Sequence, residues 1–495
     1  MLDEYTSEFI EFNTGQMSEY YLYLSGQKAD LELAPIYDRY GDLFSRDAIA
    51  GLRRRLDGCP EHFETERAAH KRLLNFAIDH YLENSVKEFT EEISQYEATA
   101  SLDWKGQRLT FQDTTVAVRT ETDRDSRREI YRKRAAIIEA SNDLRTERFS
   151  RLYEAARALG FPSYTSLYED MRQLDYSEIA RESESFLART ETAYMSALDD
   201  ALRRDMGLSI EEAERSDAHH FLHLSAYDDR FPADLLLKIY SDTMAGLGIF
   251  VESQKNIFID SEPRPRKSAR AFCTPITVPD DIRLVIRLSG GHSDYGALFH
   301  EAGHAQHYAW VSPSLRPEFR YSGDYALTET YAFLFDHLLA EPGWLACMLK
   351  FPDNRDFIRS AILTRLVTIR RYAAKVIYES HLHSTEDLAG AASLYSRLQT
   401  DATKFKTDGT DFLFDVDEGF YAANYLRAWA FEVALREHLK IRFGDQWWTS
   451  KRAGNFLREI WETGDRYNAQ EMASQIGIGP ITTDLLVEEF NERLK

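Results

Sequence analysis

Residues 300–304 read His-Glu-Ala-Gly-His, the pattern H-E-x-x-H. On an α-helix, positions i and i+4 lie on the same face, so both imidazoles can reach one metal ion. Glu301 stands beside them and can accept a proton from a water molecule. This combination of two ligands and an adjacent base is typical of zinc peptidases. The pattern therefore predicts a helix in which His300 and His304 bind zinc and Glu301 is the catalytic base.

Two solvent-facing histidines on an ordinary helix are the alternative interpretation. The residues around the pattern favour a helix, because no proline interrupts 295–306 and Pro313 ends the segment. A glycine inside a helix costs about 1 kcal/mol relative to alanine. Gly303 therefore suggests that another element packs closely against the helix, although a simple packing glycine is also compatible.

A third ligand is expected because catalytic zinc takes three protein ligands and keeps one position for water. Residues 325–336 form an amphipathic pattern, and Glu329 follows His304 by 25 residues. That distance lets the chain turn and return a second helix alongside the first. Asp336, seven residues later on the same face, could orient a ligand histidine from outside. A solvated carboxylate is the alternative for Glu329.

These residues resemble a known family. The stretch FHEAGHAQH (299–307) followed by ALTETYAFLFDHL (326–338) is similar to the thimet oligopeptidase and oligoendopeptidase F family of zinc peptidases. Residues 104–110, 122–131 and 159–164 resemble further segments of that family. The likeness runs from about residue 80 to the C-terminus. It implies that Glu329 binds the zinc ion, one per chain, and that Asp336 is the second acid.

The resemblance also implies a fold. We expect a mainly α protein, a helical two-lobed ellipsoid with a deep substrate channel and one small β-sheet next to the zinc helix. By length alone two or three domains are expected, but no Pro-, Gly- or Ser-rich linker interrupts the chain. We place an N-terminal helical lobe at 1–200 and the catalytic region at 201–495, or one continuous fold.

Transition-state groups are expected near the C-terminal end of the catalytic region. Tyr421 and Tyr425 are four residues apart, so one helix can present both phenols. They resemble the tyrosine pair that stabilises the oxyanion in the family. The family has a histidine just upstream, whereas residues 414–418 contain none. Arg427 is therefore a candidate for binding substrate, and packing is the alternative role for the tyrosines.

Two β-prone runs, 270–278 and 281–288, precede the zinc helix. Apolar and charged residues alternate in part of the second run, and Pro279-Asp280 fits a tight connection. The pattern predicts a hairpin. An exposed edge of it could pair with an extended peptide backbone, and a purely structural ribbon is the alternative.

Charge and composition exclude other partners. The net charge is −22, which opposes nucleic-acid binding because that needs a basic surface. No stretch approaches the length of a membrane span, and residues 1–5 carry no apolar signal run. Three cysteines favour a reducing compartment. We expect a cytoplasmic protein, a monomer or homodimer.

These observations favour a zinc-dependent endopeptidase that hydrolyses short unfolded oligopeptides with a zinc-activated water and Glu301 as general base. A zinc carboxypeptidase or dipeptidase of a related helical fold is one alternative, but the H-P-F and D-x-R-x-T signatures of such carboxypeptidases are absent. A catalytically silent peptide-binding homologue is the other.

Overall fold

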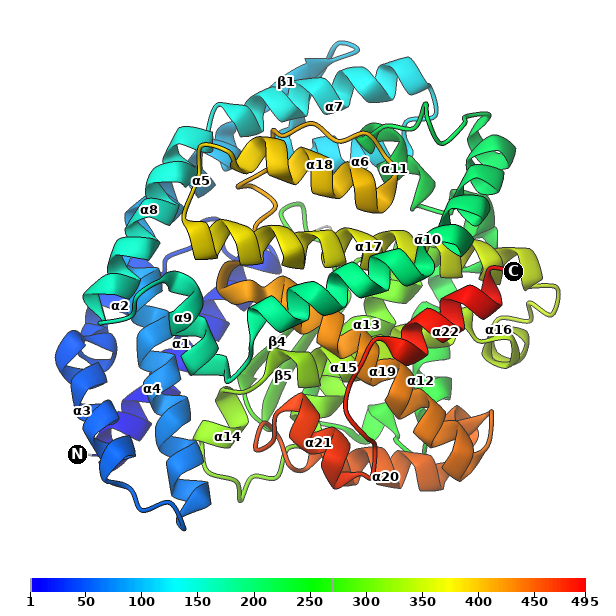
Figure 1. Cartoon of the computed structure of the whole chain (residues 1–495). Helices are drawn as coiled ribbons and strands as arrows, with labels where there is room; N and C mark the ends of the chain where they lie inside the picture. Colours follow the sequence, from blue (N-terminus) through cyan, green and yellow to red (C-terminus); the bar gives the residue numbers. More distant parts are fainter. Residues whose placement is uncertain (1, 269) are drawn as a thin grey trace. The chain divides into compact units, whose positions relative to one another are not determined.

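The computed structural model describes residues 2–268 and 270–495, and most of them are helical (Figure 1). The predicted mainly α class is confirmed. The chain forms two compact units, each built from separated segments: unit 1 is Met1–Tyr81, Ser225–Ile358 and Arg427–Leu485, and unit 2 is Leu82–Leu224, Arg359–Leu426 and Leu486–Lys495.

The two units alternate along the chain. The regions expected from the sequence, 1–200 and 201–495, are each continuous, so they do not coincide with the units. The division into an N-terminal lobe at 1–200 and a catalytic region at 201–495 stays a prediction.

Unit 1 contains helices from the start, the middle and the C-terminal part of the chain. Its α-helices are α1 (Leu2–Leu24), α2 (Ala34–Arg39), α3 (Arg46–Gly58), α4 (Glu64–Ser85), α12 (Leu236–Gly246), α13 (His292–Trp310), α14 (Glu318–Tyr321), α15 (Tyr325–Asp336), α16 (Pro342–Met348), α20 (Lys451–Trp461) and α21 (Ala469–Gln475). Its short 3-10 helices are η1 (Gly41–Phe44), η2 (Ser225–Arg230), η3 (Ala233–Leu235), η4 (Val251–Ser253), η5 (His337–Ala340) and η7 (Trp447–Thr449).

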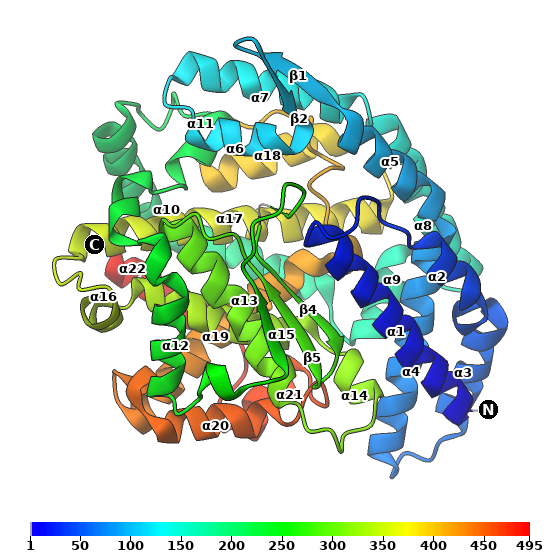
Figure 2. The same cartoon turned by 180° about the vertical axis from the view of Figure 1, so that it is seen from behind.

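A three-stranded sheet lies against α13 in unit 1 (Figure 2). Its strand order is β3 (Ile257–Asp260), β5 (Asp281–Val285), β4 (Phe272–Thr277). Strands β4 and β5 are antiparallel, which is the predicted hairpin. Strand β3 pairs with β5 in parallel and was not predicted. The helix α1 packs on β4, where Tyr21 joins Ile276 and Val285 in an apolar cluster.

Unit 2 is also helical and holds a second, two-stranded antiparallel sheet. Its elements are α5 (Lys87–Thr99), β1 (Ser101–Trp104), β2 (Gln107–Thr110), α6 (Phe111–Thr120), α7 (Arg124–Glu139), α8 (Asn142–Ala158), α9 (Tyr164–Arg172), α10 (Tyr176–Met206), α11 (Arg215–Phe221), α18 (Ala391–Thr403) and η6 (Glu418–Phe420). Helices α17 (Arg355–Thr385), α19 (Tyr421–Phe443) and α22 (Asp484–Arg493) contain a boundary between the units, as α4 does.

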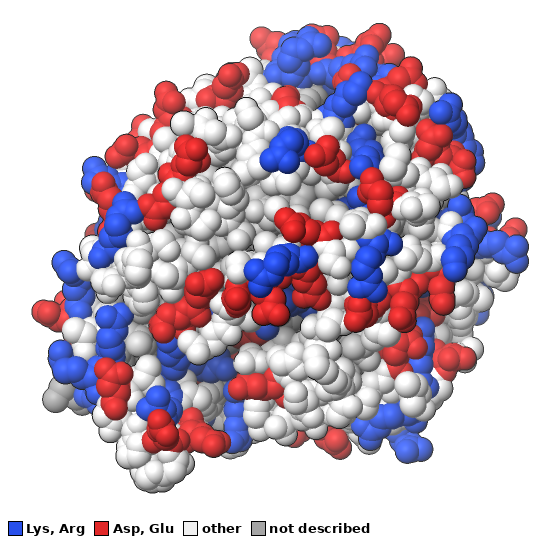
Figure 3. Space-filling view, viewed as in Figure 1, with Lys and Arg blue, Asp and Glu red and all other residues white. Residues whose placement is uncertain are grey.

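Charged side chains of both signs are interspersed over the face drawn in Figure 3. Within the described residues, every helix is too short or too polar to cross a lipid bilayer.

Candidate metal centre

The centre is built by α13 and α15, which pack closely together within unit 1. Gly303 sits between His300 and His304 on α13. A Cβ added there would lie 2.5 Å from the Cα of Ala332 and 2.6 Å from the carbonyl oxygen of Tyr331, both on α15. The close packing suggested by this helical glycine is therefore present. It brings α15, with Glu329, against the face of α13 that carries His300 and His304.

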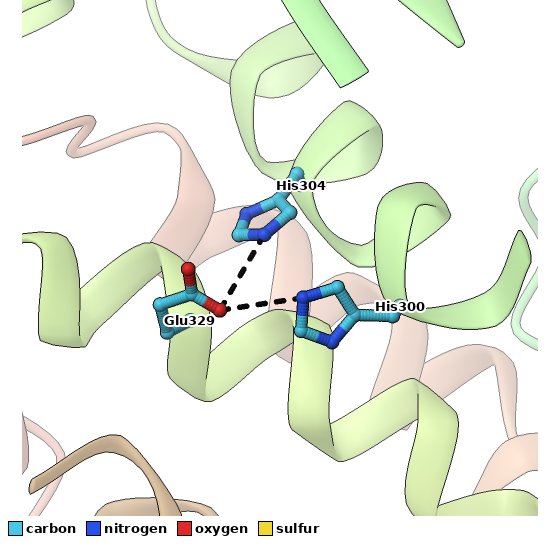
Figure 4. A group of neighbouring side chains, drawn as sticks. All are labelled: His300, His304 and Glu329. Carbon is cyan, nitrogen blue, oxygen red and sulfur yellow. Dashed lines mark ion pairs between the residues drawn. The ribbon is translucent and has the colours of Figure 1, made fainter. Parts of the chain in front are cut away.

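The three predicted ligand side chains point toward one another (Figure 4). The Oε2 atom of Glu329 lies 3.3 Å from Nε2 of His300 and 3.6 Å from Nε2 of His304. One ligand atom from each residue lies within 4.8 Å of the other two. A tetrahedral ion with ligand bonds of about 2.0–2.1 Å separates its ligand atoms by about 3.3 Å. The donor set and its spacing therefore fit a zinc ion.

The Nδ1 atoms of His300 and His304, which point away from Glu329, contact different groups. Nδ1 of His300 lies 3.4 Å from Oδ2 of Asp336, the acid that the sequence placed outside the ligands. Nδ1 of His304 lies 2.8 Å from Oγ1 of Thr328. Both imidazoles thus turn Nε2 inward, toward Glu329. Such outer contacts fix the ring orientation and the tautomer of a ligand histidine.

The electrostatic setting differs between the two histidines. For His304, burial lowers the pKa to about 4 despite the opposing charge of Glu329, so this imidazole is neutral at pH 7. For His300, burial also lowers the pKa, but Asp336 and Glu329 outweigh it and raise the pKa well above its usual value. The two carboxylates therefore favour a positive charge at this place, which is what a site for a metal ion requires. Metal binding would displace that proton, as it does from other ligand groups.

Glu301 faces the sheet from the same helix. Its Oε2 accepts a hydrogen bond of 2.8 Å from the backbone N–H of Cys273 on β4. Burial raises the pKa of Glu301 to about 7, although the charge of His300 and the Cys273 N–H lower it. A carboxylate with a pKa near the working pH is suited to take up and return a proton. The hydrogen bond holds one carboxylate oxygen in place and leaves the other for that exchange.

Strand β4 is an edge strand of the sheet order and runs beside the centre. In an antiparallel pair the backbone groups of alternate residues point away from the partner strand. Because the N–H of Cys273 points to Glu301, the backbone of Pro275 faces the same side. Proline has no N–H, so on this side Pro275 offers only a carbonyl oxygen.

Tyr421 and Tyr425 lie in the part of α19 that belongs to unit 2. Their rings are 5.1 Å apart in an edge-to-face arrangement, so they share one face of the helix as expected. The ring of Tyr425 also lies 4.9 Å from that of Tyr372. Both tyrosines are half-buried. Their role toward the oxyanion stays a prediction.

Arg427 belongs to unit 1 and contacts an acid rather than an open surface. Its guanidinium donates two hydrogen bonds to the carboxylate of Asp324, of 2.9 and 2.7 Å. Asp324 is the N-cap of α15 and also accepts from the N–H groups of Ala326 and Ala469. The substrate-binding role of Arg427 stays a prediction. Its hydrogen bonds to Asp324 also give it a structural role, because they hold the N-terminus of α15 in place.

Two residues of this centre were not predicted from the sequence, Thr328 and Asp324. Asp324 carries a readable signal, because an aspartate directly before an amphipathic run is typical of an N-cap. Thr328 carries none, since its contact with His304 depends on how α13 and α15 are rotated against each other.

Comparison with known proteins gives structural matches only. No protein-family model matches the sequence, and no curated protein does. Among solved structures, a PZ peptidase A crystallised with an inhibitor is similar with a TM-score of 0.71 and 15% identity, over 98% of this chain and 91% of that one. A structure described as oligoendopeptidase F from Bacillus anthracis strain Ames has a TM-score of 0.69 and 14% identity, over 98% and 89%. A second oligoendopeptidase F structure has a TM-score of 0.69 and 13% identity, with the same coverage.

The chain has the fold of these peptidases. The resemblance predicted from the motifs is thereby confirmed for the fold, and over nearly the whole chain rather than from residue 80 onward.

Proposed function

We propose that this protein is a zinc-dependent endopeptidase that hydrolyses short, unfolded oligopeptides. The observation that carries the proposal is the triangle of His300, His304 and Glu329, with Glu301 one residue away on the same helix. The fold supports it, since the similar structures are those of peptidases. Zinc held by these three residues would polarise the scissile carbonyl and make a water molecule more acidic.

Glu301 performs the proton transfers of the reaction. Its carboxylate accepts the proton of the attacking water and then delivers it to the nitrogen of the leaving amine. Both steps need the carboxylate at a fixed place, which the N–H of Cys273 provides. Tyr421 and Tyr425 are proposed to donate hydrogen bonds to the oxygen that becomes negatively charged.

The substrate is proposed to lie extended along β4. The carbonyl oxygens of Cys273 and Pro275 would accept hydrogen bonds from backbone N–H groups of the peptide, which gives affinity with little selectivity for side chains. A short unfolded peptide can present a free backbone, whereas a folded protein has its own backbone groups paired.

The test is mass spectrometry of a mixed oligopeptide pool after incubation with the zinc-loaded protein. The wild type is run beside Glu301→Gln and beside Glu262→Gln, which makes the same charge change at a side chain that is 85% exposed. We expect internal cuts with the wild type and the Glu262 variant, and a loss of at least about 10²-fold in rate with Glu301→Gln.

Other outcomes would contradict the proposal. Stepwise loss of C-terminal residues would identify a carboxypeptidase. Bound zinc without any cleavage would identify a peptide-binding protein. Cuts that persist in Glu301→Gln would remove Glu301 from the proposed role.

A further inference from the structure

The imidazole of His304 is held from outside by a hydroxyl group. Thr328 precedes Glu329 on α15, and its Oγ1 lies 2.8 Å from Nδ1 of His304. Its side chain is buried, with 4% of the residue exposed. The neighbouring ligand, His300, instead faces the carboxylate of Asp336. The two histidines of one ligand set therefore have outer partners of different charge.

The direction of the hydrogen bond follows from the ligand role. When Nε2 of a neutral imidazole binds a metal, the proton resides on Nδ1. Nδ1 of His304 then donates to Oγ1 of Thr328, and the hydroxyl hydrogen of Thr328 is left to donate elsewhere. Tyr308 lies one turn after His304 on α13. Its ring is nearly parallel to the imidazole of His304, with centroids 6.5 Å apart.

We propose that Thr328 is a positioning residue for metal binding, which fixes the ring plane and the tautomer of His304 through this hydrogen bond. The inference rests on the proposed function and adds a residue to it. Thr328 is not one of the three proposed ligands, and its hydroxyl contacts His304, so its effect on the metal runs through that histidine.

Three variants of α15 separate this role from packing. Thr328→Val keeps the shape of the side chain and removes the hydroxyl, whereas Thr328→Ser keeps the hydroxyl. Thr330→Val is the matched control, because Thr330 is a fully buried threonine on the same helix whose hydroxyl donates to the backbone carbonyl of Ala326. The zinc dissociation constant of each variant is measured by competition with a coloured chelator. Urea unfolding of the chelator-treated protein measures stability without metal.

We expect Thr328→Val to weaken zinc binding by about 10- to 100-fold, the usual effect of losing an outer contact of a ligand. Its stability without metal should fall no further than that of Thr330→Val. Thr328→Ser and Thr330→Val should bind zinc as the wild type does. The visible spectrum of bound cobalt should change only in Thr328→Val. If that variant fails to fold, Thr328→Ala removes the same hydroxyl and replaces it in the comparison.

The inference is overturned if Thr328→Val binds zinc as tightly as the wild type, or if Thr330→Val loses as much affinity. A wild type that does not bind zinc at all would instead remove the proposed function. The two failures are distinguishable because the first compares variants and the second concerns the wild type alone.

Discussion

Asp324 and Arg427 form a partly buried ion pair at the start of α15, and each has 14% of its side chain exposed. Burial raises the pKa of Asp324, but the Arg427 guanidinium and the N–H groups of Ala469 and Ala326 outweigh it and bring the pKa to about 2. Because α15 carries Glu329 and Thr328, the pair fixes the first turn of the helix that supplies the proposed third ligand.

We expect Arg427→Ala to lower the free energy of unfolding by about 3–5 kcal/mol, because it leaves the Asp324 carboxylate buried without its counter-charge. Urea unfolding at pH 7 measures this change. An unchanged stability together with a raised KM for peptide cleavage would show that Arg427 binds substrate instead.

The same pair predicts a pH dependence. The pKa of Asp324 is lower in the folded protein than its ordinary value near 3.8. A carboxylate with a depressed pKa stabilises the fold fully above its unfolded pKa and loses that contribution as the pH falls through its folded pKa. In Arg427→Ala burial acts on this carboxyl without the guanidinium, so its folded pKa lies above that of the wild type. The stability difference between wild type and Arg427→Ala should therefore be largest near pH 7 and shrink as the pH falls to about 2, where the carboxyl is protonated in both. Unfolding curves at stepped pH check it.

At the scale of the elements, the separation of α13 and α15 is limited by backbone atoms. The Cα of Gly303 faces the backbone of Ala332, with no room for a side chain between them. The two helices can approach to this distance only because residue 303 is glycine. The three ligand atoms span both helices, so their spacing depends on this contact.

We expect Gly303→Ala to destabilise the protein by about 1–3 kcal/mol, as overpacking does, and to weaken zinc binding as well. Gly296→Ala is the control, since it lies on the same helix with nothing within 4 Å of the added Cβ. That change should raise stability by up to about 1 kcal/mol, because alanine favours a helix. Urea unfolding and zinc titration measure both variants. Equal losses in the two would contradict the packing argument.

The elements show what the sequence can predict. The helix at 325–336 and the hairpin of β4 and β5 were predicted because their patterns are local. The parallel strand β3 was missed, since Ile257–Asp260 is short and its partner lies beyond the hairpin turn. The proximity of His300 and His304 could be predicted from their spacing on one helix, whereas Glu329 was expected beside them because of the resemblance to the family. The contacts of Thr328 and Arg427 could not be predicted, because they depend on packing between distant segments.

At the scale of the whole molecule, unit 1 draws on three separated segments of the chain. The first of them supplies α1, which covers β4 through Tyr21. The proposed ligands His300, His304 and Glu329 lie in the second segment, and Arg427 lies in the third.

A fragment of residues 201–495 lacks the first of these segments. We expect it to expose the apolar cluster of Phe272, Ile276 and Val285 that α1 covers, and therefore to aggregate or bind a hydrophobic dye. Dye fluorescence and size-exclusion chromatography compare it with the full chain. A monomeric, dye-negative fragment that binds zinc would show that the region folds alone.

The glycine contact between α13 and α15 has a consequence for metal uptake. Small zinc domains fold only when they bind zinc, so a chelator unfolds them. Here the backbone contact at Gly303 limits the separation of α13 and α15, so we expect the fold and not the ion to set the spacing of the three side chains. A chelator should abolish zinc-dependent activity while the helical circular dichroism stays unchanged. Added zinc should then restore activity at the speed of ion binding, because no part of the chain has to refold.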